Sequence, residues 1–158
     1  MKKINSFSFQ GVNGAYSEQA GKELYPEADS LPCSTFEEMF EQVRIGKADA
    51  AMVPIENSLA GRVADIHYLL PKYKLQIHGE HFQTVEHNLL CKPNANMEDI
   101  KFVRSHAQAI GQCQNLINKR KFKQIISADT AGSAKELAEG NDKSIAAIAS
   151  ELSAKIYN

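Results

Sequence analysis

The chain has 158 residues, of which 43% are hydrophobic and 23% are charged. This length and balance are typical of an ordinary globular domain that can bury a sizeable core. The 18 basic and 19 acidic residues give a formal net charge of -1, which argues against a surface built to attract nucleic acid or anionic lipid. A small-molecule partner fits this charge balance better.

The cysteines and the N-terminus indicate the compartment. Cys33, Cys91 and Cys113 are odd in number, widely spaced and outside any CxxC or Cys/His ligand pattern. We therefore expect reduced, buried cysteines in a cytoplasmic protein. The basic residues at positions 2 and 3 are not followed by an apolar run, so we expect neither a secretory leader nor a membrane span.

The first elements follow an order of strand, then helix. Alternation predicts a strand at about residues 6–10, and the loop after it leads into a helix from Ser17, a plausible N-cap, to about Leu24. A short apolar piece follows near Leu31. A second helix is predicted after the capping box of Ser34 and Glu37. Its apolar stripe consists of Phe36, Met39, Phe40 and Val43, and Gly46 ends it.

In the middle of the chain the regular succession of strands and helices is interrupted. Residues 50–55 predict a buried strand, and Ser58 is expected to open a helix that runs to Pro71. Residues 75–92 then form a long extended stretch without helical period, which we interpret as a crossover into a second lobe. Its histidines, at positions 78, 81 and 87, are expected to be mostly exposed strand residues.

The order of strand and helix resumes after the crossover. We expect strands at 102–104, 124–127 and 145–148, and helices from Ser105, over 130–139, and from about Ser150. The basic run at residues 119–123 could touch nucleic acid, but a solvated helix C-terminus is the favoured interpretation, because cations there oppose the helix dipole.

Strands separated by helices of this length predict parallel pairing and an α/β fold. We expect two lobes, residues 1–75 and 76–158, with parallel or mixed sheets and flanking helices. Ligands of such sheets bind outside the carboxyl ends of the strands. The important residues are therefore expected at the junctions between strands and helices, in a cleft formed by the lobes.

Four junctions stand out because each combines polar side chains with a predicted helix start. They are Gly14–Ser17, Glu56–Ser58, Ser105–Gln108 and Asp129–Thr130. Ordinary capping explains each of them singly, and Ser105 with Gln108 also fits a capping box.

The second junction is harder to explain by capping. Ser58 alone could cap a helix, which leaves Glu56 and Asn57 without a purpose, and Pro54 removes a donor from a strand. Gly61 would stand in a helix start, where glycine costs about 0.5–1 kcal/mol relative to alanine. Close approach of a ligand or another backbone would justify that cost.

These residues resemble a known family. Val53–Ser58 with Gly61 is similar to the V-P-I-E-N-S-x-x-G signature of prephenate dehydratases. Further similar segments follow in the family's order and cover essentially the whole chain: Gly11–Ser17, Cys33–Phe36, Val85–Leu89, Ser105–Cys113, Asp129–Ala131 and Ala146–Ser150. The resemblance implies a two-lobed fold of the periplasmic-binding-protein type II class.

The chain departs from the family pattern in three places. Val12 and Ala15 replace proline and threonine in the first loop, and Ala107 replaces a proline. The family also has a T-R-F motif downstream, whose threonine is the favoured catalytic residue, and this chain contains no such motif. We therefore expect the segment that returns to the first lobe to be absent, and little turnover from this chain alone.

The resemblance implies loss of carbon dioxide and water from prephenate to give phenylpyruvate, on the route to phenylalanine, without a metal or organic cofactor. Apart from the resemblance, we expect a cytoplasmic protein, because of its cysteines, and a homo-oligomer. On matching positions the resemblance assigns catalytic roles to Glu56, Asn57 and Gln112. It assigns substrate binding to Ser17, Ser58, Gly61, Ser105, His106, Gln108 and Thr130.

Several alternatives stay open. Glu56 could be a general acid if it were buried and neutral, although a structural carboxylate that orients its neighbours is favoured. His106 is a binding candidate, although a histidine beside a capping serine more often packs or donates to a carbonyl. The alternatives for the whole chain are arogenate dehydratase, or a non-catalytic two-lobed module that binds small anions.

Overall fold

The computed structural model describes residues 3–158; the expectation of no leader rests partly on Met1 and Lys2, which lie outside them. The chain forms two compact units. The first consists of the residues up to Val12 and Tyr16–Thr84, and the second of Asn13–Ala15 and Val85–Asn158. We expected a division after residue 75, whereas residues 76–84 lie with the first unit and a three-residue loop near the N-terminus lies with the second.

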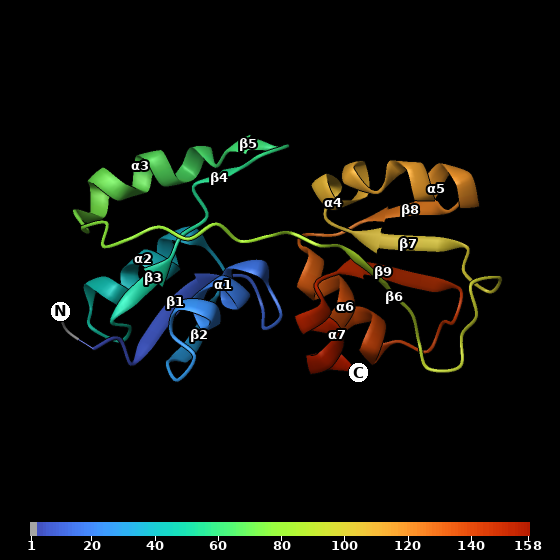
Figure 1. The fold of residues 1–158 in the computed structure, drawn as a ribbon, viewed down its shortest axis with the longest axis horizontal. Helices are drawn as coiled ribbons and strands as arrows, with labels where there is room; N and C mark the ends of the chain where they lie inside the picture. The colour runs from blue at the N-terminus through green and yellow to red at the C-terminus, as the bar shows by residue number, and fades with distance from the viewer. Residues whose placement is uncertain (1–2) are drawn as a thin grey trace. The chain divides into compact units, whose positions relative to one another are not determined.

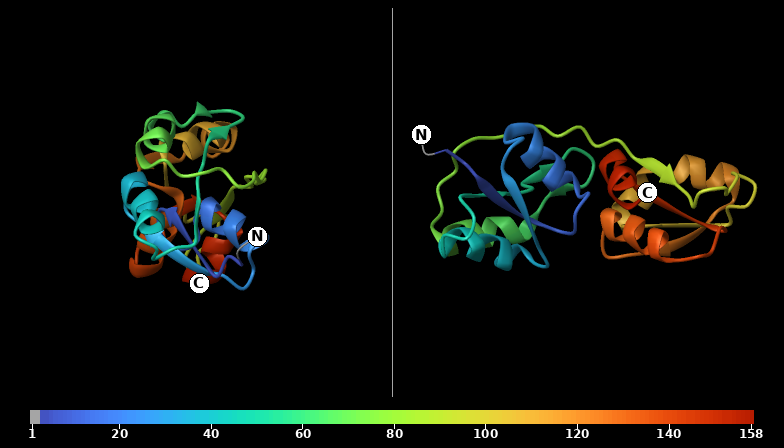
Figure 2. Two further views of the ribbon diagram at one scale, coloured as in Figure 1. Left: turned by 90° about the vertical axis from the view of Figure 1, so that its left-hand side faces the viewer. Right: turned by 90° about the horizontal axis from the view of Figure 1, so that it is seen from below.

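The first unit is built on a parallel sheet, as its alternation of strands and helices predicts. The strands β1 (Ser6–Gln10), β2 (Asp29–Cys33) and β3 (Ala50–Met52) form a three-stranded sheet in the order β2-β1-β3. Helix α1 (Tyr16–Leu24) covers one face of this sheet, while α2 (Phe36–Arg44) and α3 (Ala64–Tyr73) cover the other (Figure 2, right).

Alternation along β1 supplies both faces of this sheet. The Phe7 ring lies under α1 and meets Gly21 there, while the Ser8 hydroxyl points to the other side and donates to the Met39 carbonyl at 2.8 Å. The core on the side of α2 and α3 consists of Cys33, Met39, Phe40, Ile66 and Leu69. Burial of each large side chain stabilises the fold by about 1.5–3 kcal/mol.

The prediction that a helix begins at Ser58 is wrong. Residues 56–62 instead form a small antiparallel hairpin of β4 (Glu56–Asn57) and β5 (Gly61–Arg62), and α3 begins only at Ala64. Gly61 has a φ of +80°, a left-handed conformation that a helix cannot contain. The apolar stripe behind the prediction is real, because Ile66 and Leu69 are fully buried, but it belongs to a helix that begins later.

Two predicted helix N-caps differ from the structure by one or two residues. Thr35, not Ser34, caps α2, because its hydroxyl accepts from the Glu38 N–H at 3.1 Å while the Glu38 carboxylate accepts from the Ser34 N–H at 2.7 Å. Helix α1 starts at Tyr16, so Ser17 lies in its first turn and is not its N-cap. Neighbouring Ser and Thr residues compete for the same role, and composition alone does not decide between them.

The second unit has a mixed four-stranded sheet in the order β6-β9-β7-β8 (Figure 1). Its strands are β6 (Asn88–Leu90), β7 (Phe102–Ser105), β8 (Lys123–Ile126) and β9 (Ile145–Ala149). Strand β7 pairs in parallel with β8 and β9, whereas β6 runs antiparallel to β9 at the edge. The mixed α/β fold class predicted from the sequence is confirmed.

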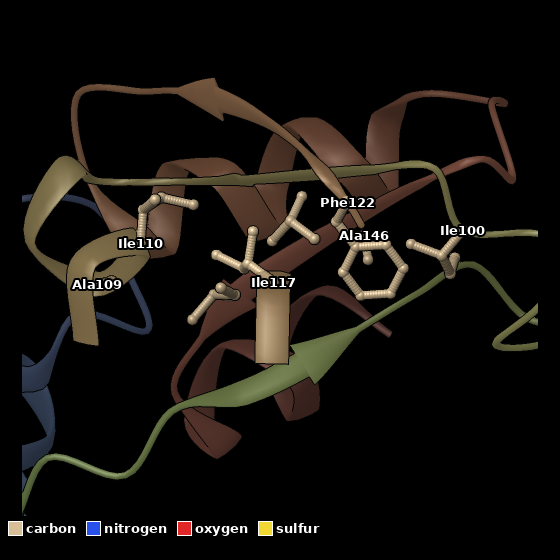
Figure 3. Close-up of a cluster of buried hydrophobic side chains, with 8 residues drawn as sticks. Ile100, Ala109, Ile110, Ile117, Phe122 and Ala146 are labelled. Atoms are coloured by element: carbon tan, nitrogen blue, oxygen red, sulfur yellow. The ribbon is translucent and has the colours of Figure 1, made fainter. Parts of the chain in front are cut away.

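Helices cover both faces of this sheet. Helices α4 (Ala107–Gln112) and α5 (Gln114–Arg120) lie on one side, while α6 (Thr130–Glu139) and α7 (Glu151–Tyr157) lie on the other (Figure 1). The single helix that we expected from Ser105 is therefore divided near Cys113. Figure 3 shows the apolar core beneath α4 and α5, which includes Ile100, Ala109, Ile110, Ile117, Phe122 and Ala146.

The loop Asn13–Ala15 is held against α7. The Gly14 carbonyl accepts hydrogen bonds from the hydroxyls of Ser150 at 2.6 Å and Ser153 at 3.0 Å, and both are buried. The Tyr157 hydroxyl donates to the Asn13 carbonyl at 2.8 Å. Three side chains near the end of the chain therefore fix the main chain of the first motif.

The crossover segment is extended and largely irregular up to β6, as its lack of helical period predicts. His78 is exposed, while His81 and His87 are half-buried and contact Glu23 and Gln112. The basic run at residues 119–123, which begins in the last turn of α5, is exposed except for Phe122, as expected. No helix in residues 3–158 combines the length and the hydropathy needed to span a membrane.

The cysteines are all free. Cys33 is buried and Cys113 is partly buried, but Cys91 is exposed. The expectation that all three are buried is therefore wrong for Cys91. This residue follows the edge strand β6, where no further strand covers it.

Candidate functional site

In the second unit, the parallel strands bring several candidate residues to one edge of the sheet. Strands β7 and β8 end together, since Ser105 is aligned with Ile126, and helices α4 and α6 begin just after them. Ser105, His106 and Gln108 follow β7, and Thr130 follows β8. These polar side chains therefore lie at the carboxyl ends of the strands, where open α/β sheets bind their ligands.

Ser105 is committed to the fold. It is fully buried, and its hydroxyl donates to the Ile148 carbonyl of β9 at 2.6 Å. It can still accept a hydrogen bond, but it has no second proton to donate. The bond joins the ends of β7 and β9, so its evident role is to fix the edge of the sheet.

His106, rather than Ser105, caps α4. Its Nδ1 atom accepts from the Gln108 N–H at 3.3 Å, so the capping box expected for Ser105 and Gln108 is wrong. In the neutral ring the proton then lies on Nε2, which is the nitrogen that can donate. The Gln108 side chain is exposed at the first turn of this helix.

Gln112 lies at the end of α4 and contacts a residue from a different motif. Its Oε1 atom is 2.7 Å from Nε2 of His87, which directly precedes β6. An amide oxygen only accepts, so the imidazole nitrogen is the donor. The NH2 group of Gln112 has no acceptor among residues 3–158.

Thr130 is the first residue of α6, and its junction shows the capping that the sequence predicts. Asp129 accepts from the Gly132 N–H at 2.5 Å through its Oδ1 atom. The Ser133 hydroxyl donates to the Asp129 carbonyl at 2.8 Å. Thr130 itself is half-buried beside this cap.

In the first unit, Asn57 organises the hairpin β4-β5. Its Oδ1 atom accepts from the N–H groups of Leu59 at 2.9 Å and Ala60 at 3.0 Å, which closes the turn. Its NH2 group has no acceptor among the described residues of the chain. Asn57 therefore has the same polarity as Gln112: the oxygen is held internally and the nitrogen remains available.

The other candidates in the first unit are less constrained. Glu56 and Ser58 are exposed, so the burial that would make Glu56 a neutral general acid is not present. Gly61 has open space where a side chain would project. Close approach of another backbone, one of the two reasons that we gave for this glycine, is therefore wrong, and the positive φ of Gly61 accounts for it. Ser17 is half-buried in the first turn of α1.

Burial makes two of the cysteine thiols unsuitable as nucleophiles. Burial raises the pKa of the Cys113 thiol above its ordinary value of 9.0. Burial, with the Glu38 carboxylate nearby, also raises the pKa of Cys33 above 9.0. Both sulfurs are protonated near neutral pH and are therefore poor nucleophiles. No group of three or more His, Cys, Asp or Glu side chains in residues 3–158 is placed to hold a metal ion.

The sequence reasoning missed His87 and the serines of the last motif. His87 was taken for an ordinary strand residue, yet it holds Gln112 from 25 positions away. Ser150 was taken for a helix start, which it is, but it also holds Gly14. The available signal was that each pair joins two motifs of the same resemblance.

Comparisons with known proteins agree with this geometry. The prephenate dehydratase family model matches residues 7–158. Arogenate dehydratase/prephenate dehydratase 2, chloroplastic, from Arabidopsis thaliana is 43% identical over 150 residues, which are 95% of this chain and 39% of that protein.

Two solved structures are also similar. GqqA, described as a novel type of quorum quenching acylase, aligns with a TM-score of 0.91 and 41% identity over 96% of this chain and 56% of that one. Prephenate dehydratase from Arthrobacter aurescens, in complex with L-Phe, aligns with a TM-score of 0.77 and 28% identity over 96% and 52%. The chain thus spans between two fifths and three fifths of the length of these relatives, and it belongs to the prephenate dehydratase family.

Proposed function

We propose that this chain carries substrate-binding groups of a prephenate dehydratase, which converts prephenate to phenylpyruvate. The observation that carries the proposal is the shared polarity of Asn57 and Gln112. Each amide oxygen is occupied by a donor within the chain, and each NH2 group is left to donate. Prephenate is a dianion with two carboxylates, which such donors suit.

The reaction places few demands on the protein. The bond from the ring to its carboxylate breaks to release carbon dioxide, and the electron pair moves into the ring. The ring hydroxyl leaves with its bonding pair and takes up one proton to become water. Because the ring becomes aromatic, the protein needs to hold the dianion and supply that proton.

The residues divide accordingly. We propose that Asn57, Ser58, Gln108 and Gln112 bind oxygens of the substrate, and that Ser17, Gly61, Ser105, His106 and Thr130 shape the surroundings. Glu56 is exposed, which supports a role in orienting its neighbours rather than in donating the proton. The resemblance assigns the proton donor to the T-R-F motif, which this sequence lacks.

Arogenate is the second candidate substrate, because the Arabidopsis relative carries both names. Arogenate has an amino group where prephenate has a keto oxygen, so the two differ in charge at one position. We favour prephenate, and we further propose a role in phenylalanine biosynthesis in the cytoplasm, as a homo-oligomer. Three free cysteines suit a reducing compartment.

Calorimetric titration of the chain with prephenate and with arogenate tests this proposal. We expect prephenate to bind, and Asn57→Ala and Gln112→Ala each to weaken binding about tenfold or more, since hydrogen bonds to charged groups contribute about 1.5–3 kcal/mol. Asn115→Ala is the matched control, because Asn115 is an exposed amide on the next helix.

Tighter binding of arogenate would reassign the substrate. Absence of binding by both compounds, or unchanged binding in both variants, would contradict the proposal. Phenylpyruvate formation, measured in parallel, is expected to be slow, and rapid turnover would contradict the role that we give to the missing motif. Sedimentation velocity measures the oligomeric state.

A further inference from the structure

The contact between His87 and Gln112 joins two parts of the second unit that are separately anchored. His87 directly precedes β6, whose first residue Asn88 pairs with Ala149 of β9. Gln112 ends α4, and the following N–H, of Cys113, bonds to the Ala109 carbonyl at 3.1 Å. Each backbone is therefore fixed independently of the side-chain contact.

The contact matters because a glutamine side chain is otherwise free to rotate. Gln112 is exposed, and ordering a free glutamine side chain costs up to about 1.5–2 kcal/mol of conformational entropy. The 2.7 Å bond to His87 restricts the side chain before any ligand arrives. A ligand that meets an ordered amide does not have to supply that entropy itself.

The polarity of the contact also selects which end of the amide is free. The Nε2–H of His87 is a donor in one neutral tautomer and in the charged ring, so either form can hold the Gln112 oxygen. With Oε1 occupied, the NH2 group is the part of Gln112 that remains for a ligand. The reverse orientation would present an oxygen, which a carboxylate would repel.

We propose that His87 is a positioning residue, which holds the Gln112 carboxamide so that its NH2 group is presented to a carboxylate or carbonyl oxygen of the substrate. This inference rests on the proposed function, because it assumes that Gln112 binds the substrate. His87 itself does not touch the reacting atoms.

Side-chain NMR of the 158-residue chain, combined with prephenate titration, tests the inference. Comparison of the wild type with Gln112→Ala assigns the Gln112 NH2 signals. Correlation of the His87 ring nitrogens with the ring protons reads the tautomer, which we expect to carry the proton on Nε2. His87→Phe keeps a flat ring without a donor, whereas His87→Gln restores an N–H donor of similar reach.

We expect His87→Phe to move the Gln112 NH2 signals toward those of a free glutamine side chain. It should weaken prephenate binding about two- to tenfold, as the loss of one hydrogen bond predicts. His87→Gln should restore both readouts. His78→Phe is the matched control, because His78 is an exposed histidine on the extended segment of the first unit, and neither readout should change.

The outcomes separate the inference from the proposed function. If Gln112→Ala weakens binding but His87→Phe changes neither binding nor the NH2 signals, the inference alone is overturned. A neutral ring with its proton on Nδ1 would also overturn it. If His87→Phe is misfolded, failure of the folded His87→Gln to keep wild-type affinity decides against it. If the wild type binds no prephenate, the proposed function fails and the substrate part of the inference fails with it.

Discussion

The Ser150 hydroxyl donates to the Gly14 carbonyl over 2.6 Å, although the two residues are 136 positions apart. Both groups are buried, so the bond is shielded from competition by water. Ser150 also caps α7 by accepting from the Ser153 N–H at 3.0 Å. One side chain thus starts the last helix and fixes the loop of the first motif.

Gly14→Ala should destabilise the second unit. The φ of Gly14 is +93°, and an added Cβ would lie 2.9 Å from the Ser153 Cα atom and 2.5 Å from its hydroxyl oxygen. We expect a loss of about 1–3 kcal/mol in the free energy of unfolding, measured by urea denaturation. Gly79→Ala is the control, because Gly79 has open space and an ordinary φ; equal effects of the two changes would contradict the packing described.

A second pair of glycines tests packing inside helices. Gly21 of α1 lies against the Phe7 ring, so a Cβ there would collide with it, whereas Gly111 of α4 has open space. We expect Gly21→Ala to cost about 1–3 kcal/mol. Gly111→Ala should stabilise the chain by about 0.5–1 kcal/mol, because alanine favours the helix. Melting temperatures that move in the same direction for both would refute this assignment.

Asn57 substitutions separate the turn from substrate binding. Asn57→Ala removes the acceptor for the Leu59 and Ala60 N–H groups, but the hairpin is exposed, so global stability should change by about 1 kcal/mol or less. Prephenate binding should be strongly weakened. Asn57→Asp keeps the acceptor and loses the NH2 donors, so it should protect the two amides from hydrogen exchange and still bind prephenate poorly. Normal binding by Asn57→Asp would assign the residue to the turn alone.

The three thiols should differ in reactivity. Cys91 is exposed, whereas Cys33 and Cys113 are covered and have pKa values raised above 9.0. In the folded chain at pH 7.5 we expect one fast reaction with a thiol reagent, mapped to Cys91 by mass spectrometry, and its loss in Cys91→Ser. Two fast thiols would contradict the described burial.

The raised pKa values also predict a pH dependence of stability. The unfolded thiols ionise near pH 9, while the folded thiols of Cys33 and Cys113 stay protonated to higher pH. The stability associated with the protonated thiols is therefore complete below pH 9 and is lost as the pH rises through the folded pKa values. Urea midpoints between pH 8 and 10.5 measure this, and Cys33→Ala with Cys113→Ala should flatten the decline.

The sequence predicted elements well where a single periodicity dominated. Helix α6 has the predicted bounds, and β1 does as well, because the pattern of each ends at clear turn residues. The prediction failed at residues 56–63, where an apolar helical stripe suggested a helix from Ser58. The side-chain turn of Asn57 and the left-handed Gly61 make a hairpin there, and both are decided by local geometry that a periodicity does not contain.

The candidate site was predictable as a set of positions but not as a set of contacts. Motif matching named Gln112 and Gly14, yet their partners His87 and Ser150 come from distant segments. Such pairings depend on the register of β6 against β9 and on the placement of α7. A one-dimensional pattern carries no information on either, so the sequence did not predict that His87 contacts Gln112 or that Ser150 contacts Gly14.

The loop Asn13–Ala15 has a practical consequence for anyone who divides this protein. A fragment of residues 85–158 looks like a natural unit in the linear sequence, but it lacks the loop between β1 and α1 that Ser150, Ser153 and Tyr157 bind. A short peptide with the sequence of residues 11–17, added to this fragment, would have to bind the same three hydroxyl groups. The second unit thus consists of two separate stretches of the sequence, and adding such a peptide to the fragment measures how much the first motif contributes to its stability.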